Sequence, residues 1–288
     1  MSHENPPSFF KKKIQTFNAI SQEEGFWAAL LRTSHFYIDK TGWFQDRWIF
    51  GRLIELRGNM VRLEGCKFSL NSPYLQTEIK SRFVLGRYER RERKMIRRYL
   101  DPRVPVIELG GSIGVVACVT NKRLKDPKKH VVVEANPNLI PLLTTNRDLN
   151  GCSFTILNKA YAPSQKEATF YIDTKFVTGG MQRVTGESIT VPTVSLAEIF
   201  AQHDFQYANL ICDIEGGEVE LTTHEKELIS KKISHIVVEV HYSNVAAGAI
   251  ECFRQELESV GFRKVRTGTY STVWVFENTH LHLPFAKN

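Results

Sequence analysis

The chain has 288 residues, of which 42% are hydrophobic, and a formal net charge of +7 at pH 7. This length is enough for one sizeable α/β domain with an accessory piece. The longest apolar run near the N-terminus, residues 26–31, is far too short to cross a bilayer, and the first residues lack the pattern of a secretory signal. Five cysteines stand singly, without a CxxC pair, so we expect reduced thiols in a cytoplasmic protein.

The basic charge belongs to the N-terminal third of the chain. Residues 1–100 hold 19 Lys and Arg against 10 Asp and Glu, together with 16 of the 31 aromatic residues. The sequence pattern here predicts a helix over 22–36, a small hairpin over 59–70 and a basic helix over 87–98. We expect this region to serve as a lid or as a surface for an acceptor, a membrane or a second chain. The alternative is a solvated face that covers the sheet locally.

From residue 104 onward, strand-like apolar runs alternate with helical patterns, which predicts an α/β fold with a parallel sheet. An extra β insertion is expected over 166–172 and 188–194, and a closing hairpin over 262–268 and 271–277. The expected central strands are 104–109, 130–135, 152–160, 208–214 and 234–240. The predicted boundaries are 1–84 for an accessory region, 85–280 for the α/β domain and 281–288 for a C-terminal tail.

The loop after the first of these strands is rich in glycine, with the sequence VIELGGSIG over 106–114. A dinucleotide loop would need glycine where Ser112 stands, and a phosphate-binding Walker loop would end in Gly-Lys-Ser/Thr. The spacing Glu108-x-Gly110-x-x-x-Gly114 instead resembles the first loop of methyltransferases that use S-adenosylmethionine (SAM). There the glycines let the backbone turn tightly against the amino-acid end of the cofactor. A plain strand-to-helix turn is the alternative at this point.

The next two strands also end in polar residues. Glu134, 24 positions after Gly110, stands where nucleotide-binding α/β proteins place the acid that accepts the ribose hydroxyls, and SAM has the same diol. A solvated strand-end glutamate is the alternative. Asn158 and Ala160 end the third strand, where we expect the adenine edge to be recognised.

The fourth strand ends in DIEGGE (213–218), with three carboxylates in six residues, and the fifth ends in Glu239-Val240-His241. Acids at a helix N-terminus are common for structural reasons, but Asp213 comes earlier, where the reactive methyl group is expected. Strand alternation puts Glu239 and His241 on one face, and an ordinary histidine pKa of about 6.5 suits proton transfer from a hydroxyl. No metal ligand is assigned, because these side chains could hold an ion only if the fold brought them together.

The chain from about residue 88 to 277 resembles the FkbM-type SAM-dependent methyltransferases. The matching stretches are GRYERRE (86–92), IELGGSIG (107–114), VEANPN (133–138), NKA (158–160), VPTVSL (191–196), DIEGGE (213–218) and VEVH (238–241). The resemblance implies a Rossmann-like class I methyltransferase fold, with a mostly parallel seven-stranded sheet, helices on both faces and a small N-terminal α+β extension. It also implies O-methylation of a hydroxyl on a sugar, glycolipid, polysaccharide or secondary metabolite.

The cofactor implied is SAM, with S-adenosylhomocysteine as the product, and a divalent metal is conceivable without support from the sequence. The expected catalytic residues are Asp213, Glu239 and His241. The residues expected to bind the cofactor are Glu108, Gly110, Gly111, Ser112, Gly114, Glu134, Ala135, Asn136, Asn158, Ala160 and Asp213.

Three other function classes compete with this interpretation. A nucleic-acid methyltransferase would explain the basic third, but the fourth strand lacks both the Asn/Asp-Pro-Pro-Tyr/Phe signature and the Pro-Cys of cytosine-modifying enzymes. An NAD-dependent oxidoreductase conflicts with the glycine spacing. A non-catalytic scaffold for carbohydrate or membrane association is the last alternative.

A basic cluster leads directly into the first strand of the sheet. Helical spacing would bring Arg90, Arg93, Lys94 and Arg97 together into one concentrated patch. We therefore expect an anionic or membrane-associated acceptor, and a protein that works at the membrane periphery, whereas nucleic acid is not an expected partner. The cluster consists of Arg87, Arg90, Arg91, Arg93, Lys94, Arg97 and Arg98.

Overall fold

The protein is described by a computed structural model that places residues 18, 21, 48–84, 86–172, 179–180, 187–265, 267 and 271–285. The predicted helix over 22–36 lies outside these residues. The chain divides into two compact units, an N-terminal unit (Met1–Arg90) and an α/β unit (Arg91–Asn288), and each is described by itself. No helix in the described ranges is long and apolar enough to span a bilayer.

The N-terminal unit contains a β-hairpin between two helices. β1 (Met60–Leu63) and β2 (Cys66–Ser69) pair antiparallel, which confirms the predicted hairpin. The helices are α3 (Trp48–Leu56) and α4 (Thr77–Val84). They approach closely, since a Cβ added at Gly51 would lie 2.1 Å from the carbonyl oxygen of Thr77.

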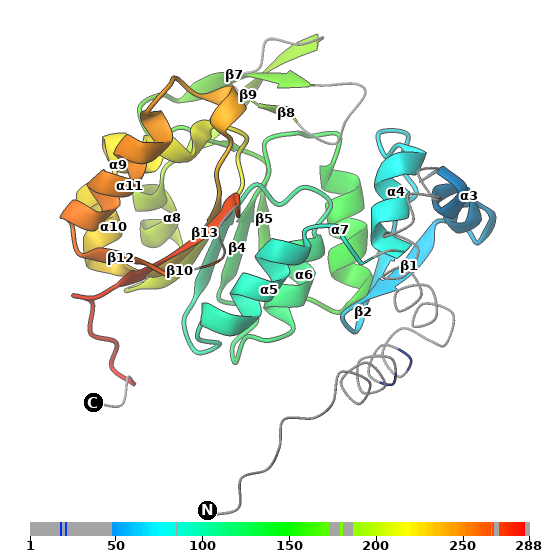
Figure 1. The fold of residues 1–288 in the computed structure, drawn as a ribbon, viewed down its shortest axis with the longest axis horizontal. Helices are drawn as coiled ribbons and strands as arrows, with labels where there is room; N and C mark the ends of the chain where they lie inside the picture. Colours follow the sequence, from blue (N-terminus) through cyan, green and yellow to red (C-terminus); the bar gives the residue numbers. More distant parts are fainter. Residues whose placement is uncertain are drawn as a thin grey trace, which may run out of the picture. The chain divides into compact units, whose positions relative to one another are not determined.

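The α/β unit is built on a seven-stranded sheet with the order β12-β13-β11-β10-β3-β4-β5 (Figure 1). Five strands run parallel, and β13 pairs antiparallel with both β11 and β12. This confirms the predicted mostly parallel sheet and its closing hairpin. The strands are β3 (Val106–Leu109), β4 (His130–Val133), β5 (Thr155–Leu157), β10 (Ala208–Cys212), β11 (Ile233–Glu239), β12 (Phe262–Val265) and β13 (Val273–Asn278).

Helices cover both faces of this sheet, and Figure 1 shows them in two groups on either side of it. One group is α5 (Arg90–Tyr99), α6 (Val115–Asn121) and α7 (Ile140–Leu149). The other is α8 (Leu196–Gln202), α9 (Glu220–His224), α10 (Lys226–Lys232) and α11 (Ala249–Ser259). Helix α8 is preceded by the N-cap residue Ser195, which forms a capping box with Glu198: the side chain of each residue accepts a hydrogen bond from the backbone N–H of the other.

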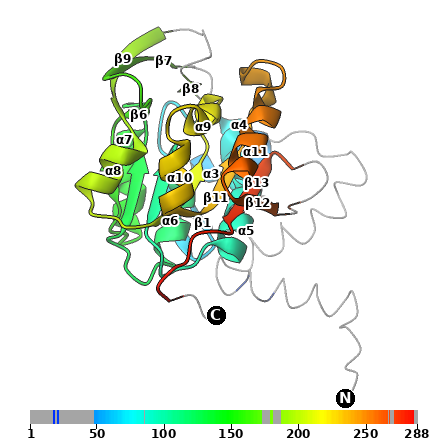
Figure 2. The same cartoon turned by 90° about the vertical axis from the view of Figure 1, so that its left-hand side faces the viewer.

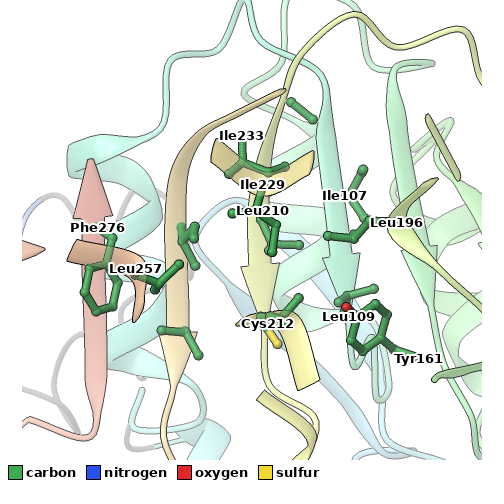
Figure 3. Close-up of a cluster of buried hydrophobic side chains, with 14 of the residues drawn as sticks. Ile107, Leu109, Tyr161, Leu196, Leu210, Cys212, Ile229, Ile233, Leu257 and Phe276 are labelled. Atoms are coloured by element: carbon green, nitrogen blue, oxygen red, sulfur yellow. The ribbon is translucent and has the colours of Figure 1, made fainter. Parts of the chain in front are cut away.

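The two faces of the sheet carry separate apolar clusters. Residues at alternate positions of β3 and β10, such as Leu109 and Cys212, pack with α8–α11 (Figure 3). The intervening positions, such as Val106 and Ile211, pack with Met95 on α5 and with α6. Because the central strands carry apolar side chains on both faces, the sheet is buried between two helical layers.

A second, four-stranded sheet follows β5, and Figure 2 shows it at the upper left of the unit. The antiparallel pairing of β7 (Glu167–Ile172) with β9 (Glu187–Val194) confirms the predicted β insertion. The continuous strand predicted over 152–160 is wrong. Only β5 belongs to the main sheet, and β6 (Ala160–Tyr161) pairs with β9 in the second sheet, beside the short β8 (Gly179–Gly180).

Candidate active site

The carboxyl ends of the five parallel strands meet at one edge of the main sheet. The chain winds outward from β3 through β4 and β5 in one direction, and from β10 to β11 in the other. Open α/β sheets bind their ligands at such a switch between strand directions. The residues that follow the parallel strands at this edge include Gly110, Glu134, Asn158, Asp213 and His241.

Gly110 follows β3 at the switch point, where the chain lies close to the residue that follows β10. Its φ is +90°, and an added Cβ would lie 1.8 Å from the carbonyl oxygen of Asp213. The expected reason for this glycine was space for the methionine end of the cofactor, whereas the structure shows that the backbone after β10 already requires it. Gly111 and Gly114 are also close-packed, with an added Cβ 2.4 Å from Val132 Cγ1 and 2.6 Å from Leu143 Cδ1, respectively.

Ser112 and Glu134 join the loop after β3 to the loop after β4. Ser112 has a φ of +47°, rare for a residue with a side chain, and its backbone N–H donates to Glu134 Oε2 at 2.7 Å. The N–H of Asn136 donates to Oε1, also at 2.7 Å. Burial raises the pKa of Glu134 to about 7, although these backbone donors act in the opposite direction. The carboxylate keeps further lone pairs for hydroxyl donors, so its chemistry fits a ribose diol.

Asn158 and Ala160, the two residues predicted at the adenine edge, lie in different surroundings. The Asn158 side-chain amide donates to the backbone oxygens of Glu134 and Ala135, at 2.8 and 3.2 Å, which ties the end of β5 to the loop after β4. Ala160 is 2% exposed and packs in the core of the second sheet, with Ala135 against that core. Contact between Ala160 and a cofactor therefore receives no support from this arrangement.

Glu108 is buried away from the loops at the edge of the sheet. It was expected to bind the cofactor, but its carboxylate is 1% exposed and makes no hydrogen bond to the described residues. It lies 3.4 Å from His130 Nε2, on the face of the sheet that α5 and α6 cover. Burial raises the pKa of Glu108 well above its ordinary value and lowers that of His130 to about 3, so burial favours the neutral form of each group.

On the other side of the switch point, His241 lies among carboxylates from the loop after β10. Its Nδ1 is 2.9 Å from Glu218 Oε1, and its Nε2 is 3.5 Å from Asp213 Oδ1 and 3.7 Å from Glu215 Oε2. Glu218 is fully buried and also accepts the N–H groups of Ile214 and Gly216. The side chain of His241 is 18% exposed and that of Asp213 33% exposed, so solutes can reach both.

This environment changes the expected chemistry of His241. Burial alone would lower its pKa, but the Glu218 hydrogen bond and the charges of Asp213, Glu218 and Glu215 outweigh burial and raise the pKa to about 9. The imidazole is therefore protonated at neutral pH and is a poor proton acceptor. The ordinary pKa expected from the sequence does not apply to His241, because the surrounding carboxylates stabilise the protonated ring.

Glu239 completes the cluster. As strand alternation predicted, it lies with His241, and one ligand atom from each of Asp213, Glu239 and His241 is within 4.8 Å of the others. The hydroxyl of Thr272 donates to Glu239 Oε1 at 2.8 Å. Two carboxylates and an imidazole thus converge at the edge of the sheet beside the glycine loop.

A known family model matches the part of the chain that carries these sites. The model, described as the methyltransferase FkbM domain, matches residues 108–264. The chain belongs to the FkbM methyltransferase family. The match includes the glycine loop, Glu134 and the whole Asp213, Glu239 and His241 cluster, so this FkbM protein is a SAM-dependent methyltransferase.

Solved methyltransferase structures resemble the FkbM chain at low identity. Magnesium protoporphyrin IX methyltransferase from Synechocystis PCC 6803, with bound SAM, is 10% identical; the match covers 69% of this chain and 81% of that one, with a TM-score of 0.40. TYW2 from M. jannaschii, with AdoMet, is 15% identical, with 76% and 85% coverage and a TM-score of 0.39. Fibrillarin from Aeropyrum pernix, with natively bound S-adenosyl-L-methionine, is 10% identical, with 62% and 68% coverage and a TM-score of 0.37. No curated protein matches the chain.

Glu218 contributes to this FkbM site in a way that was not expected from the sequence. Acids in this stretch were expected as helix N-terminal residues, and Glu218 does lie in the short helix η1 (Gly217–Val219). The preceding Glu215 and Gly216 have φ values of +54° and +109°, so the chain turns back and points Glu218 at its own loop. The Gly-Gly pair in DIEGGE was the available signal for such a tight turn.

Proposed function

We propose that this FkbM methyltransferase transfers the methyl group of SAM to a hydroxyl of a sugar, a glycolipid or polysaccharide, or a secondary metabolite. The observation that carries the proposal is the cluster of Asp213, Glu239 and His241 beside the glycine loop. O-methylation needs a group that accepts the hydroxyl proton and a positive charge near the oxygen as it becomes negative. The cluster offers both.

SAM fits the other half of the edge. Glu134 would accept the ribose hydroxyls, because its buried carboxylate is already oriented by the backbone N–H groups of Ser112 and Asn136. Asn158 holds the backbone of Glu134 and Ala135, which borders the expected adenine position. The glycine loop lets the chain after β3 pass close to Asp213. When bound, SAM supplies a methyl group on a positively charged sulfur.

The chemistry divides between Asp213 and His241. The acceptor oxygen forms a bond to the methyl carbon while the carbon–sulfur bond breaks and leaves its electron pair on sulfur. In our proposal the Asp213 carboxylate takes the hydroxyl proton, and the positive charge at His241 stabilises the oxygen as that proton leaves. Glu218 acts as a positioning residue, because it fixes the ring of His241 through Nδ1. Alignment of the two reactants provides the rest of the acceleration.

We also propose that the acceptor is anionic, and this proposal rests on the charge of the surface of α5. Five basic side chains of α5 are exposed, but Arg93 is 1% exposed, so the patch that helical spacing predicted does not include it. Exposed Lys and Arg attract an acidic glycan or an anionic headgroup at low salt. The exposed residues are Arg90, Arg91, Lys94, Arg97 and Arg98. We propose on the same ground that the protein works in the cytoplasm, at the membrane periphery.

A transfer assay with radiolabelled SAM tests the proposed acceptor class. The purified chain is incubated separately with neutral oligosaccharides, acidic oligosaccharides, an extracted glycolipid fraction and total RNA. We expect label in at least one hydroxyl-bearing fraction and none in RNA. Label in RNA alone would show that the basic surface serves a nucleic-acid methyltransferase and would overturn the proposal.

A further inference from the structure

Two adjacent strands bring three metal-ligating side chains to one point. Asp213 follows β10, Glu239 ends β11, and His241 follows two residues later. One oxygen or nitrogen from each lies within 4.8 Å of the other two. Oxygen ligands bind Mg²⁺ or Ca²⁺ at about 2.0–2.6 Å, so two ligands of one ion are at most about 4–5 Å apart. The three atoms are therefore close enough to share an ion with little side-chain movement.

The orientation of His241 distinguishes this cluster from an ordinary group of acidic residues on a protein surface. Nδ1 bonds to the fully buried Glu218, which is held in turn by the backbone N–H groups of Ile214 and Gly216. Because Nδ1 donates to Glu218, the other ring nitrogen faces the Asp213 carboxylate. Histidines that bind metals in proteins nearly always have this arrangement, with the second nitrogen on a carboxylate or carbonyl.

The spacing around Nε2 also fits an ion. Nε2 lies 3.5 Å from Asp213 Oδ1. Charge-assisted N–H···O bonds are much shorter, about 2.7–2.9 Å. Neighbouring ligands in an octahedral shell lie about 1.4 times the metal–ligand distance apart and opposite ligands about twice that distance, so the 3.5 Å between His241 Nε2 and Asp213 Oδ1 suits two ligands of one ion.

We infer that Asp213, Glu239 and His241 bind a divalent cation of the Mg²⁺ and Mn²⁺ class. Carboxylate oxygens favour these cations, and imidazole extends the set toward Mn²⁺. Glu218 and the hydroxyl of Thr272 act as outer partners, on His241 and Glu239. The cation would replace the proton on Nε2 of His241, which is released to solvent, and would take over the positive charge near the acceptor oxygen. That catalytic consequence rests on the function proposed above, whereas cation binding itself does not.

Mn²⁺ binding to the full chain tests the inference directly. The protein is treated with chelator, Mn²⁺ is titrated in, and free Mn²⁺ is measured by electron paramagnetic resonance. We expect saturable binding that Asp213→Asn, Glu239→Gln and His241→Ala each weaken at least about 10-fold, and that Glu218→Gln weakens about 10- to 100-fold. Glu277→Gln is the matched control, because Glu277 also lies on a strand but pairs with Arg263 outside the cluster.

S-adenosylhomocysteine binding is measured calorimetrically on the same samples, and circular dichroism checks that each variant is folded. If the wild type binds S-adenosylhomocysteine but no Mn²⁺, the cation site is overturned and the proposed methyl transfer stands. If it binds Mn²⁺ but no S-adenosylhomocysteine, the methyl-transfer function fails instead. Unchanged Mn²⁺ affinity in Glu239→Gln, which keeps the shape of the side chain, also overturns the site, even if another variant fails to fold.

Discussion

Glu218 Oε1 lies 2.9 Å from Nδ1 of His241, and the carboxylate that makes this contact has no exposed surface. The same carboxylate accepts two backbone N–H groups of its own loop. One buried acid therefore fixes both the turn after β10 and the ring that stands at the end of β11. Its removal should disturb catalysis without touching the part of the edge where SAM is expected.

Replacing Glu218 with Gln tests this positioning role. Gln has one acceptor oxygen in place of two and brings an N–H group against other donors, so we expect a stability loss of about 1–3 kcal/mol. Misplacement of His241 should also lower kcat by up to about 100-fold, with little change in SAM binding. Glu220→Gln is the control, since Glu220 pairs with His224 on the surface of α9. Normal kcat in a folded Glu218→Gln variant would leave Glu218 with a structural role alone.

The pH dependence of cofactor binding tests Glu134. Its folded pKa of about 7 lies above the ordinary 4.5, so the buried group keeps a proton that the unfolded chain has lost. Burial therefore destabilises the folded protein increasingly as pH rises from about 4.5 to 7. The ionised form, however, is the better acceptor for the ribose hydroxyls.

Affinity for S-adenosylhomocysteine should therefore increase as pH rises through about 7. Glu134→Ala should weaken binding by about 1.5–3 kcal/mol. Glu134→Gln controls for titration of the ligand's own groups, because it cannot ionise. If calorimetry gives the same pH profile for the wild type and Glu134→Gln, Glu134 does not bind the ribose.

Gly110→Ala tests the backbone contact at the switch point. The new Cβ would overlap the Asp213 carbonyl oxygen and would need a positive φ, which alone costs about 1–2 kcal/mol. Gly151→Ala isolates that backbone cost, because Gly151 has a φ of +56° and nothing within 4 Å of an added Cβ. Urea denaturation should show a clearly larger loss for Gly110→Ala. Equal losses would mean that the loop after β3 can move away from β10 freely.

Charge reversal on α5 tests the anionic acceptor. Arg91→Glu with Lys94→Glu should raise KM for an acidic acceptor at low salt, leave S-adenosylhomocysteine binding unchanged, and reduce the salt dependence of KM. Lys128→Glu with Lys129→Glu makes the same change in net charge elsewhere on the surface and serves as the control. An acceptor KM that responds equally to both pairs would assign the effect to net charge.

Much of the fold could be predicted from local pattern. Buried apolar runs such as 208–212 and 233–239 indicate central strands, and turn residues indicate where they end. The break after β5 could not be predicted, because it depends on the bonds of Asn158 to a loop that lies more than twenty residues away in the sequence. Alternation identifies residues on one strand face, but not which helix covers that face.

The residues of the candidate site could be predicted from the sequence, but their environments could not. The motifs identified Asp213, Glu239 and His241, because acids and histidine at strand ends are visible in one sequence. The raised pKa of His241 depends on carboxylates from the loop after β10, and the burial of Glu108 and Arg93 depends on packing between layers. These are tertiary effects that a single sequence does not encode locally.

The most direct test of methyl transfer to a hydroxyl is to follow the methyl carbon itself. The chain is incubated with SAM carrying a ¹³C methyl group and the glycan or glycolipid fraction that accepts label, and the product is examined by ¹³C NMR. We expect a methyl carbon bonded to oxygen, formed about 10²–10⁴-fold more slowly by Asp213→Asn although that variant still binds S-adenosylhomocysteine. A methyl carbon bonded to nitrogen or carbon, or an undiminished rate in Asp213→Asn, would contradict the proposal.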